Sequence, residues 1–360
     1  MNLDVIRDSA SVVKRLRESF DSRGFVFLGV TDLDVASDHA RFLAWLDAGN
    51  HAGMEFLVRN AGLRRDAHNI LPDAESAVVF GLPYAPPDAE AKAVRPGIAK
   101  YARLRDYHKV MWEEGEAAFQ EAVPDAAISR RVCVDSAPVL ERALAAKTGA
   151  GFIGKNTCFI AGKLGSFLLL GVVLTALKIQ ETRPAPLEKS RRNANDCGSC
   201  QRCQTHCPTG ALDVAWNLDS RKCLSYWTIE HRGVIPEEFW PWLGKYWYGC
   251  DICQDVCPYN RSGGRLSRTD LMRSLESIPL RQVATMDQGL YEKLFGGTAM
   301  TRARKSGLRR NALIAMAVTG DPALDGILGT ILNDAGDDDT VVKETARQVW
   351  RFTQDRKRRR

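Results

Sequence analysis

The stretch that decides the fold is "CGSCQRCQTHCPTG", residues 197–210. Four cysteines stand within eleven residues, and a proline follows the last of them. Thiolates are soft, negatively charged ligands that suit transition metals, whereas disulfides persist mainly in oxidising compartments. The first residues, "MNLDVIRDSASVVKRLRESF", lack the basic-then-apolar order of a secretion signal, so we expect a cytoplasmic protein. The grouped cysteines therefore predict metal binding.

The spacing of this run is that of bacterial ferredoxins, in which three cysteines hold one four-iron cluster and the fourth reaches a neighbouring cluster. A second run, "CDICQDVCP" from Cys250, repeats the last three cysteines and the proline but has Trp247 where the first run has Cys197. Cys223 is the remaining cysteine of this segment, so we expect it to supply the missing ligand. The predicted sets are Cys197, Cys200, Cys203 and Cys257 for one cluster, and Cys207, Cys223, Cys250 and Cys253 for the other. A structural zinc site is the alternative, which the close spacing and trailing proline disfavour.

The composition is that of a globular protein with more than one domain. The chain has 360 residues, of which 45% are hydrophobic and 26% charged, and single cores usually stop growing beyond roughly 250 residues. The longest apolar run, from Phe167 to Leu177, is too short to cross a bilayer, which takes about 20 residues. We therefore expect no membrane partner, and we expect a monomer because no long exposed heptad pattern is present.

Apolar residues recur at alternating helical and strand-like periods in the first 190 residues, which predicts mixed α/β layers. The expected helices cover Val5–Phe20, Asp38–Leu46, Tyr107–Ala122 and Pro138–Lys147. The expected strands begin at Phe25, Ser76, Arg130 and Phe167. A charged linker, "QETRPAPLEKSRRNAND", precedes the cysteine segment. After Asn260 the strand patterns cease, and three helical stretches between Gly307 and Phe352 predict a short α-solenoid that ends in a frayed basic terminus.

Several longer stretches resemble the signatures of a known family. These are "VDSAPVLERALAAKTGAGFIGKNT" from Val134, "GSFLLLG" from Gly165, "RKCLSYWTIE" from Arg221 and "YGCDICQDVCPYNR" from Tyr248. They are similar to epoxyqueuosine reductase, a cobalamin-dependent iron-sulfur enzyme that acts on tRNA in the last step of queuosine synthesis. The resemblance implies an α+β multidomain fold: a mixed α/β cobalamin-binding domain like that of reductive dehalogenases (1–190), a ferredoxin-like domain with two four-iron four-sulfur clusters (191–262) and a HEAT-like helical domain (263–360).

Asp135 is the residue that we expect to donate a proton. It follows the apolar strand pattern "RRVCV", where desolvation would favour the protonated acid. The resemblance places the catalytic acid here, in a reaction that reduces the epoxide to an alkene with loss of water. A cap for the helix expected near Pro138 is the alternative role.

The cobalamin contacts rest on the resemblance alone. It implies that Lys155 and Asn156 of "GFIGKNTCF" reach the amide rim of the corrin and that Phe159 gives an apolar contact. Further family contact positions fall on Arg64, Ala99, Asp135, Leu170, Ser225 and Asp251. The expected resting state is cob(II)alamin. "DYHKVM" carries only half of the Asp-x-His-x-x-Gly cobalamin signature, because Met111 replaces the glycine, so His108 is a poor candidate for a cobalt ligand.

Basic residues gather at the start of the first C-terminal helical stretch, in "TRARKSGLRRN". Arginines at such a place can pair with phosphate oxygens, and a helix N-terminus adds partial positive charge. With the implied tRNA substrate, this predicts RNA contacts by Arg302, Arg304, Lys305, Arg309 and Arg310. A solvated helix face is the alternative.

Two other functions compete with an epoxyqueuosine reductase that is supplied by an external low-potential electron donor. One is another corrinoid iron-sulfur reductase such as a dehalogenase, a class that usually carries an export signal and has no use for a basic helical end. The other is a noncatalytic electron carrier or RNA-binding protein, which would bind no corrinoid.

Overall fold

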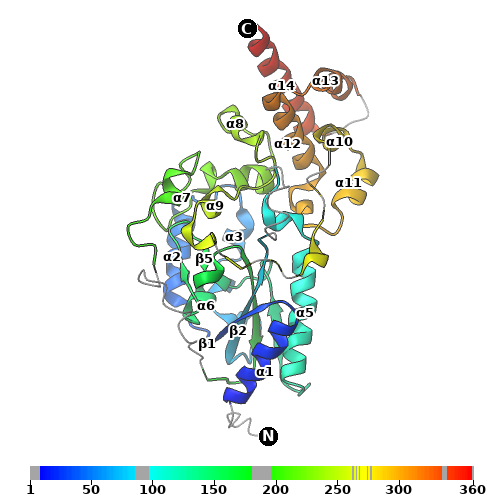
Figure 1. Ribbon diagram of the computed structural model, residues 1–360. Coiled ribbons are helices and arrows are strands. Elements are labelled where there is room, and N and C mark those ends of the chain that lie inside the picture. Colours follow the sequence, from blue (N-terminus) through cyan, green and yellow to red (C-terminus); the bar gives the residue numbers. More distant parts are fainter. Residues whose placement is uncertain are drawn as a thin grey trace.

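The computed structural model describes residues 9–85, 97–180, 196–261, 263, 264, 266, 268–273, 275, 278–334 and 339–358. A sheet with its covering helices forms one end of the molecule, and helices from the last part of the chain form the other (Figure 1). The cysteine segment lies between them (Figure 1). The predicted charged linker lies outside the described residues except for its first and last positions.

The sheet has four strands in the order β1-β2-β6-β3. The strands are β1 (Val26–Thr31), β2 (Ser76–Pro83), β3 (Arg130–Cys133) and β6 (Leu168–Thr175). All neighbouring strands run antiparallel. The four predicted strands are therefore present, and every residue of β2 is buried because this strand is covered on both faces. A two-stranded hairpin of β4 (Phe152–Ile153) and β5 (Phe159–Ile160) was not predicted, because two residues per strand leave no periodicity to detect.

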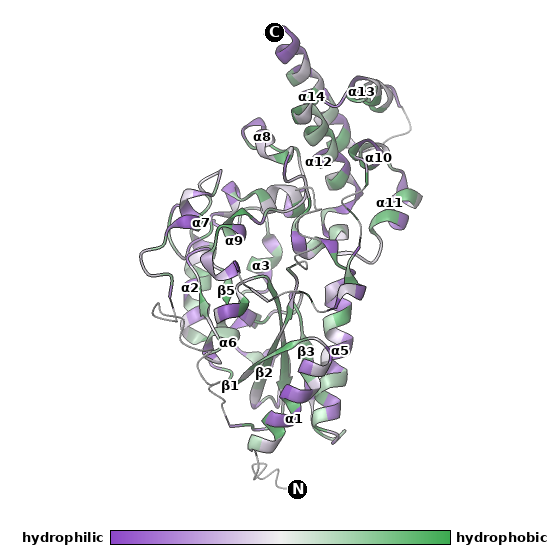
Figure 2. Cartoon of the chain, viewed as in Figure 1, coloured by the Kyte–Doolittle hydropathy of each residue, from purple (hydrophilic) through white to green (hydrophobic). Residues whose placement is uncertain are grey.

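Alternate side chains of β2 enter two separate cores. Val78, Phe80 and Leu82 belong to a core shared with α1 (Ser9–Ser22) and α5 (Tyr107–Ala122). Ala77 and Val79 point the other way and pack with α6 (Glu141–Lys147). This alternation is the two-residue period of a strand. Figure 2 shows the resulting hydrophobic layer along the strands.

The predicted helix bounds differ from the observed ones mainly at the beginnings. The predicted start of α1 at Val5 lies outside the described residues. The prediction for α5 matches its observed bounds, and α2 covers Ala36–Asp47. The helix expected from Pro138 begins only at Glu141, because the preceding residues form bends that carry Asp135 away from β3.

The cysteine segment consists of very short elements. Two four-residue helices, α7 (Arg202–Thr205) and α9 (Ile252–Asp255), occupy corresponding places in the two cysteine runs. Cys223 ends the 3-10 turn η5 (Ser220–Lys222), and a π-helix, η6 (Tyr226–Glu230), follows it. The remaining helices near this segment are η7 (Glu237–Phe239), α8 (Trp240–Leu243), η8 (Pro258–Asn260) and α3 (Glu55–Arg59).

The C-terminal part is helical, as predicted. Its helices are α10 (Leu280–Thr285), α11 (Gln288–Phe295), α12 (Arg304–Thr319), α13 (Leu324–Asn333) and α14 (Thr340–Arg358), with the 3-10 turns η9 (Thr269–Leu271) and η11 (Ala299–Ala303) before α12. The predicted fraying of the basic terminus is wrong as far as Arg358, because α14 continues to that residue and Lys357 Nζ lies 2.7 Å from Asp325 Oδ2.

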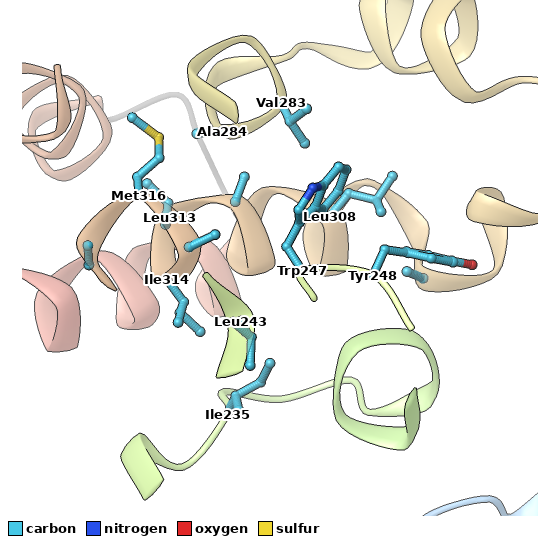
Figure 3. Packing of buried hydrophobic residues seen from close by; sticks show 14 of the residues in the cluster. Ile235, Leu243, Trp247, Tyr248, Val283, Ala284, Leu308, Leu313, Ile314 and Met316 are labelled. Atoms are coloured by element: carbon cyan, nitrogen blue, oxygen red, sulfur yellow. The ribbon is translucent and has the colours of Figure 1, made fainter. Parts of the chain in front are cut away.

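Helix α12 lies at the centre of the largest apolar core. Its Leu308, Leu313 and Ile314 are fully buried. Residues between Cys223 and Cys250, among them Ile235 and Leu243, pack against the same helix (Figure 3). The cysteine segment and the C-terminal helices therefore share one core. Among the described residues, no helix has the length and apolar character needed to span a membrane.

Candidate active site and cysteine groups

Asp135 stands on a strained turn just beyond β3. Its φ of 49° lies in the left-handed region, which is uncommon for a residue with a side chain. The Ser136 N–H donates to the Val134 carbonyl at 2.5 Å and closes the turn around Asp135. The side chain of Asp135 is 67% exposed. The turn therefore presents a carboxylate outward from the end of a buried strand, an arrangement that is common at functional sites.

A chain of hydrogen bonds holds this carboxylate. His108 Nε2 lies 3.0 Å from Asp135 Oδ2, and His108 Nδ1 lies 2.8 Å from Asp106 Oδ1. The Tyr107 hydroxyl donates to the same Asp135 oxygen at 3.2 Å, and its ring stacks on the imidazole of His108. Asp106 also accepts the His108 N–H at the start of α5. One helix N-terminus thus supplies three side chains to the Asp135 site.

The charge state of Asp135 differs from the expectation. The hydrogen bond from His108 lowers the pKa of Asp135 more than burial raises it. Burial works to lower the pKa of His108, but its hydrogen bonds to Asp135 and Asp106 outweigh burial and raise it. The prediction of a carboxyl kept neutral by desolvation is therefore wrong. The hydrogen bond between them favours the ionised form of Asp135 and the protonated form of His108.

Sequence reasoning did not identify Asp106, Tyr107 and His108 as partners of Asp135. The signal was the Asp-x-His spacing in "DYHKVM", which we interpreted only as an incomplete cobalamin signature. That spacing lets the aspartate cap the helix and orient the imidazole at the same time.

Arg302 approaches the same site from the C-terminal part. Its Nε donates to both carboxylate oxygens of Glu230, at 2.9 and 3.0 Å. Its guanidinium lies 4.8 Å from the centre of the Phe56 ring. The charge of Arg302 helps to lower the pKa of Asp135. Residues from α3, the π-helix η6 and η11 therefore meet beside the Asp135 carboxylate.

The other predicted RNA contacts divide into two groups. Arg304 is exposed and Lys305 is half-buried at the start of α12. Arg309 and Arg310 are 6% and 0% exposed. Arg309 Nε donates to the Ala284 carbonyl, and Arg310 donates to three backbone carbonyls between residues 227 and 233. The prediction that Arg309 and Arg310 contact RNA is therefore wrong in this structure, because their guanidinium groups are used inside the core.

The cysteines form two groups in space. Burial raises the pKa of Cys257, and the charges of Cys197, Cys203 and Cys200 raise it further. In the second group, burial raises the pKa of Cys250 to about 12, with further contributions from Cys223 and Cys207. The charges of Cys223 and Cys250 likewise raise the pKa of Cys253. Such mutual effects require short separations, and they group the thiols as the two predicted ligand sets do.

Exposure does not separate the two groups. Cys257 of the first group is buried, and the other seven cysteines are half-buried. Burial is the main cause of the raised pKa values of Cys223 and Cys253 and also of Cys257. Residues beside the first group, such as Gly198, Gln201 and Arg202, are exposed. The described residues contain no set of three His, Cys, Asp or Glu side chains spaced for a single metal ion.

Lys155 supports the first cysteine group instead of projecting away from it. Its N–H donates to Cys197 Sγ at 3.3 Å, and its Nζ donates to the carbonyls of Gly198 and Cys200 at 2.8 and 3.0 Å. The residue is 8% exposed. A buried ammonium group therefore fixes the loop that carries Cys197 and Cys200, and nothing in these contacts directs it to a corrin.

Most of the other positions implied as cobalamin contacts are buried in this structure. Ala99, Phe159 and Asp251 are buried, and Asp251 accepts the Lys100 N–H at 2.8 Å. Asn156 Nδ2 donates weakly to the Cys253 carbonyl at 3.4 Å. Ser225 lowers the pKa of Cys223 by donating hydrogen bonds to it. These residues support the cysteine groups and the core, whichever ligand binds beside them.

Arg64 and Leu170 are the last two positions implied as cobalamin contacts, and both lie near the sheet. Arg64 is buried, donates to the Asn60 carbonyl at 3.1 Å and lies over the ring of Phe42. Leu170 is only partly buried, and it lies on the part of β6 that extends beyond the pairing with β3. Ala137, Leu140, Ile153 and Leu170 are partly buried apolar residues that pack against the same core.

Cys133 and Cys158 lie outside the two groups. Cys133 is fully buried, and burial raises its pKa to about 12, so it packs as a small hydrophobic residue of the core. Burial raises the pKa of Cys158 to about 11, and the charges of Cys257 and Cys203 contribute. The charge of Cys158 in turn raises the pKa of Cys253, so Cys158 lies close to both cysteine groups.

Comparisons with known proteins agree with this geometry. The family model described as "4Fe-4S double cluster binding domain" matches residues 196–260. The model described as "Epoxyqueuosine reductase QueG, DUF1730" matches residues 64–136. Both matches cover residues that build the two parts of the site.

Full-length comparisons cover most of the chain. Epoxyqueuosine reductase of Vibrio cholerae serotype O1 is 34% identical over 320 residues, which are 86% of this chain and 84% of that protein. A crystal structure of epoxyqueuosine reductase with an epoxyqueuosine-modified tRNA-Tyr stem loop has a TM-score of 0.82 at 25% identity and covers 94% of this chain and 89% of that one. The Bacillus subtilis epoxyqueuosine reductase, in a structure with an aspartate-bearing catalytic loop swung out of the active site, has a TM-score of 0.78 at 26% identity, with 93% and 88% covered.

Proposed function

The chain belongs to the epoxyqueuosine reductase family, and from this we propose that it reduces epoxyqueuosine to queuosine in the anticodon loop of tRNA. The observation that carries the proposal is the hydrogen-bonded chain from Asp106 through His108 to Asp135, beside two groups of cysteines. The reaction takes two electrons and two protons and releases the epoxide oxygen as water. The enzyme works in the cytoplasm with an external low-potential electron donor.

The cysteines hold two four-iron four-sulfur clusters in the predicted sets. Cys197, Cys200, Cys203 and Cys257 form the first set, and their mutual effects on pKa support it. Cys207, Cys223, Cys250 and Cys253 form the second, on the same ground. Because Gly198, Gln201 and Arg202 beside the first set are exposed, electrons enter there and pass to the second set.

Cobalamin is the group that the family implies at the substrate, and the residues present fit it in one respect. Leu170, Ala137 and Leu140 are partly buried apolar side chains that pack against the core shared by α6 and the sheet, and such side chains suit an apolar ring face. Both nitrogens of His108 are already hydrogen-bonded, so this imidazole stays with its carboxylate partners. When bound, cobalamin supplies the reducing equivalents at the epoxide carbon. The residues that would hold it are Leu170, Arg64 and backbone groups near Asn156, with Asp135 facing the reacting side.

Asp135 and His108 together deliver a proton to the epoxide oxygen. The raised pKa of His108 favours its protonated form, and Asp135 Oδ2 lies 3.0 Å from His108 Nε2. As negative charge develops on the epoxide oxygen, His108 gives its proton to Asp135, and Asp135 passes that proton to the oxygen. General acid catalysis of this kind contributes typically about 10²- to 10⁴-fold in rate. The left-handed turn at Asp135 keeps the carboxylate outside the sheet, where a substrate can reach it.

The tRNA lies against the junction of the cysteine segment and the C-terminal helices. Arg302, Arg304 and Lys305 are its phosphate contacts on this chain, since they remain at the surface or half-buried. The tRNA stem loop in the related crystal structure supports this class of substrate. We keep the division at residues 1–190, 191–262 and 263–360 as a proposal, with the first domain like reductive dehalogenases and the last HEAT-like, and with the second and third packed on one shared core.

The test uses the full chain reconstituted without oxygen with iron, sulfide and cobalamin. Epoxyqueuosine-containing tRNA is added with a chemical low-potential reductant, and the nucleosides are separated and weighed by mass spectrometry. Conversion of epoxyqueuosine to queuosine is expected with both cofactors, and its loss is expected when cobalamin is left out. No conversion by the fully loaded protein, or full conversion without cobalamin, would refute the proposal.

A further inference from the structure

A turn in the cysteine segment exposes two large apolar side chains two positions apart. Val214 is 63% exposed and Trp216 is 57% exposed, which are the two highest values among the exposed large hydrophobic residues of the described chain. Exposed apolar side chains are ordinary when they stand singly. Here both lie on one turn between the first cysteine run and Cys223. The turn therefore concentrates apolar surface within the segment that carries the cysteines.

Hydrogen bonds fix this turn on both sides, although it lies at the surface. Trp216 has a φ of 60°, in the left-handed region that is strained for an aromatic residue. Its Nε1 donates to the Ile153 carbonyl at 3.1 Å, and its N–H donates to the Lys155 carbonyl at 3.0 Å. Gln204 Nε2, on α7, donates to the Asp213 carbonyl at 3.2 Å. Strain that is maintained to present an exposed ring favours a binding role over a role in stability.

Two consecutive hydrogen bonds connect the turn to a cysteine of the first group. The Trp216 N–H donates to the Lys155 carbonyl, and the Lys155 N–H donates to Cys197 Sγ at 3.3 Å. The Lys155 Nζ lies 5.6 Å from the centre of the Trp216 ring and also donates to the carbonyls of Gly198 and Cys200. A single residue therefore separates an exposed indole from a ligand of the proposed first cluster.

The charged groups beside the turn carry both signs. Asp213 Oδ2 lies 3.5 Å from Lys222 Nζ, and both side chains are exposed. Arg202 and Asp196 are exposed on the neighbouring first cysteine run. Charges of both signs give little electrostatic steering, so recognition at this surface rests on apolar contact. The surface therefore suits a partner whose own contact area is apolar and not strongly acidic.

We propose that Val214 and Trp216 form the docking surface of the external electron donor, and that this donor is a small protein with a reduced flavin. The benzenoid edge of a flavin is planar and apolar, so it can stack on an indole. Electron-transfer complexes are small and transient, as a two-residue apolar contact requires. The flavin gives one electron to the first cluster in each encounter, and two encounters supply the two electrons of the reaction. The inference rests on the proposed function, because that reaction requires an outside reductant.

The test measures reduction of the clusters in the reconstituted full chain, without tRNA, by a purified bacterial flavodoxin in its fully reduced form. The two are mixed without oxygen, and the loss of cluster absorbance gives the rate. Trp216→Ala should slow this reduction by about tenfold, as for loss of an aromatic anchor from an interface, and Val214→Ser should slow it less. Trp350→Ala removes an exposed tryptophan from α14 and is the matched control, so it should keep the wild-type rate. The wild-type rate should change little between low and moderate salt.

A small chemical reductant separates docking from damage to the clusters. Dithionite needs no docking surface, so it should reduce Trp216→Ala at the wild-type rate, and the variant should keep its iron content. Equal slowing with both reductants, or an unchanged rate with flavodoxin, would overturn the proposal. So would faster reduction of the wild type by a two-iron ferredoxin with a steep salt dependence, because the donor would then be an acidic iron-sulfur protein. If flavodoxin reduces the clusters through this surface but the loaded protein converts no epoxyqueuosine, the proposed function fails while the docking surface stands.

Discussion

Replacing Arg310 with methionine should loosen the connection between α12 and the segment that follows Cys223. Arg310 is fully buried. Its two terminal nitrogens donate to the carbonyls of His231, Gly233 and Trp227 at 2.8, 2.6 and 2.8 Å. Methionine fills much of the same volume but cannot donate a hydrogen bond. Each of the three carbonyls would then lose its charged partner.

The magnitude follows from two opposing contributions. A buried group left without its partner costs about 1–3 kcal/mol, so three carbonyls together cost roughly 3–9 kcal/mol. Removing the guanidinium also removes its own burial cost of several kcal/mol, and that cost is evident because burial lowers the pKa of Arg310 to about 9. We expect the free energy of local opening to fall by about 3 kcal/mol. This decrease makes exchange of the amides faster by on the order of a hundredfold.

The assay is native-state hydrogen exchange of the full chain, read over residues 226–234 by mass spectrometry. Arg309→Met is the matched control, because Arg309 is also buried on α12 but directs its Nε to the Ala284 carbonyl on α10. Arg310→Met should accelerate exchange in the 226–234 segment, whereas the control should act mainly around α10. Equal exchange in that segment for both variants would refute the idea that Arg310 fixes it.

Four further outcomes are expected. Asp135→Asn should remove conversion of epoxyqueuosine while the iron content and tRNA affinity stay at wild-type values, and normal turnover would contradict its role as the acid. Cys223→Ser should lower the iron bound from about eight to about four atoms per chain, measured with acid-labile sulfide, and eight retained irons would exclude Cys223 as a ligand. The pKa of His108 is higher in the folded protein than in the unfolded chain. The resulting stabilisation is therefore complete below the pKa of the unfolded chain and is lost as the pH rises through the pKa of the folded protein. Thermal unfolding should show this loss with rising pH in the wild type and not in His108→Asn. Lys155→Met should shift the reduction potential of the first cluster to more negative values, since a buried positive charge is lost beside Cys197. A redox titration followed by electron paramagnetic resonance measures this potential, and an unchanged value would contradict the prediction.

Local patterns in the sequence were sufficient for much of the fold. The strand at β2 is predictable because its apolar, β-branched run needs burial on both faces. The bounds of α5 are predictable because Asp106 caps its start and its apolar residues keep helical spacing. The hairpin of β4 and β5 was missed because it depends on Gly151, where an added Cβ would lie 2.1 Å from the Ile160 carbonyl oxygen. Close backbone approach of this kind leaves no periodic signal.

The grouping of the cysteines was predictable from the sequence, but the charges around Asp135 were not. Cysteine spacing alone grouped the thiols as their mutual pKa effects do in the structure. The ionised state of Asp135 depends on His108, which lies 27 positions earlier in the chain. The same limit explains Arg310, which appears in sequence as one basic residue in a charged run. Only tertiary packing reveals that its partners are backbone carbonyls in a distant segment.

The core shared by α12 and the residues between Cys223 and Cys250 has a consequence for biogenesis. A nascent chain exposes its last cysteine, Cys257, well before the ribosome has made α12 (Arg304–Thr319). Until that helix emerges from the exit tunnel, Ile235 and Leu243 lack the helix on which they pack in the folded chain. We therefore expect stable loading of metal to follow synthesis of α12, so that assembly factors meet a chain that already contains this helix.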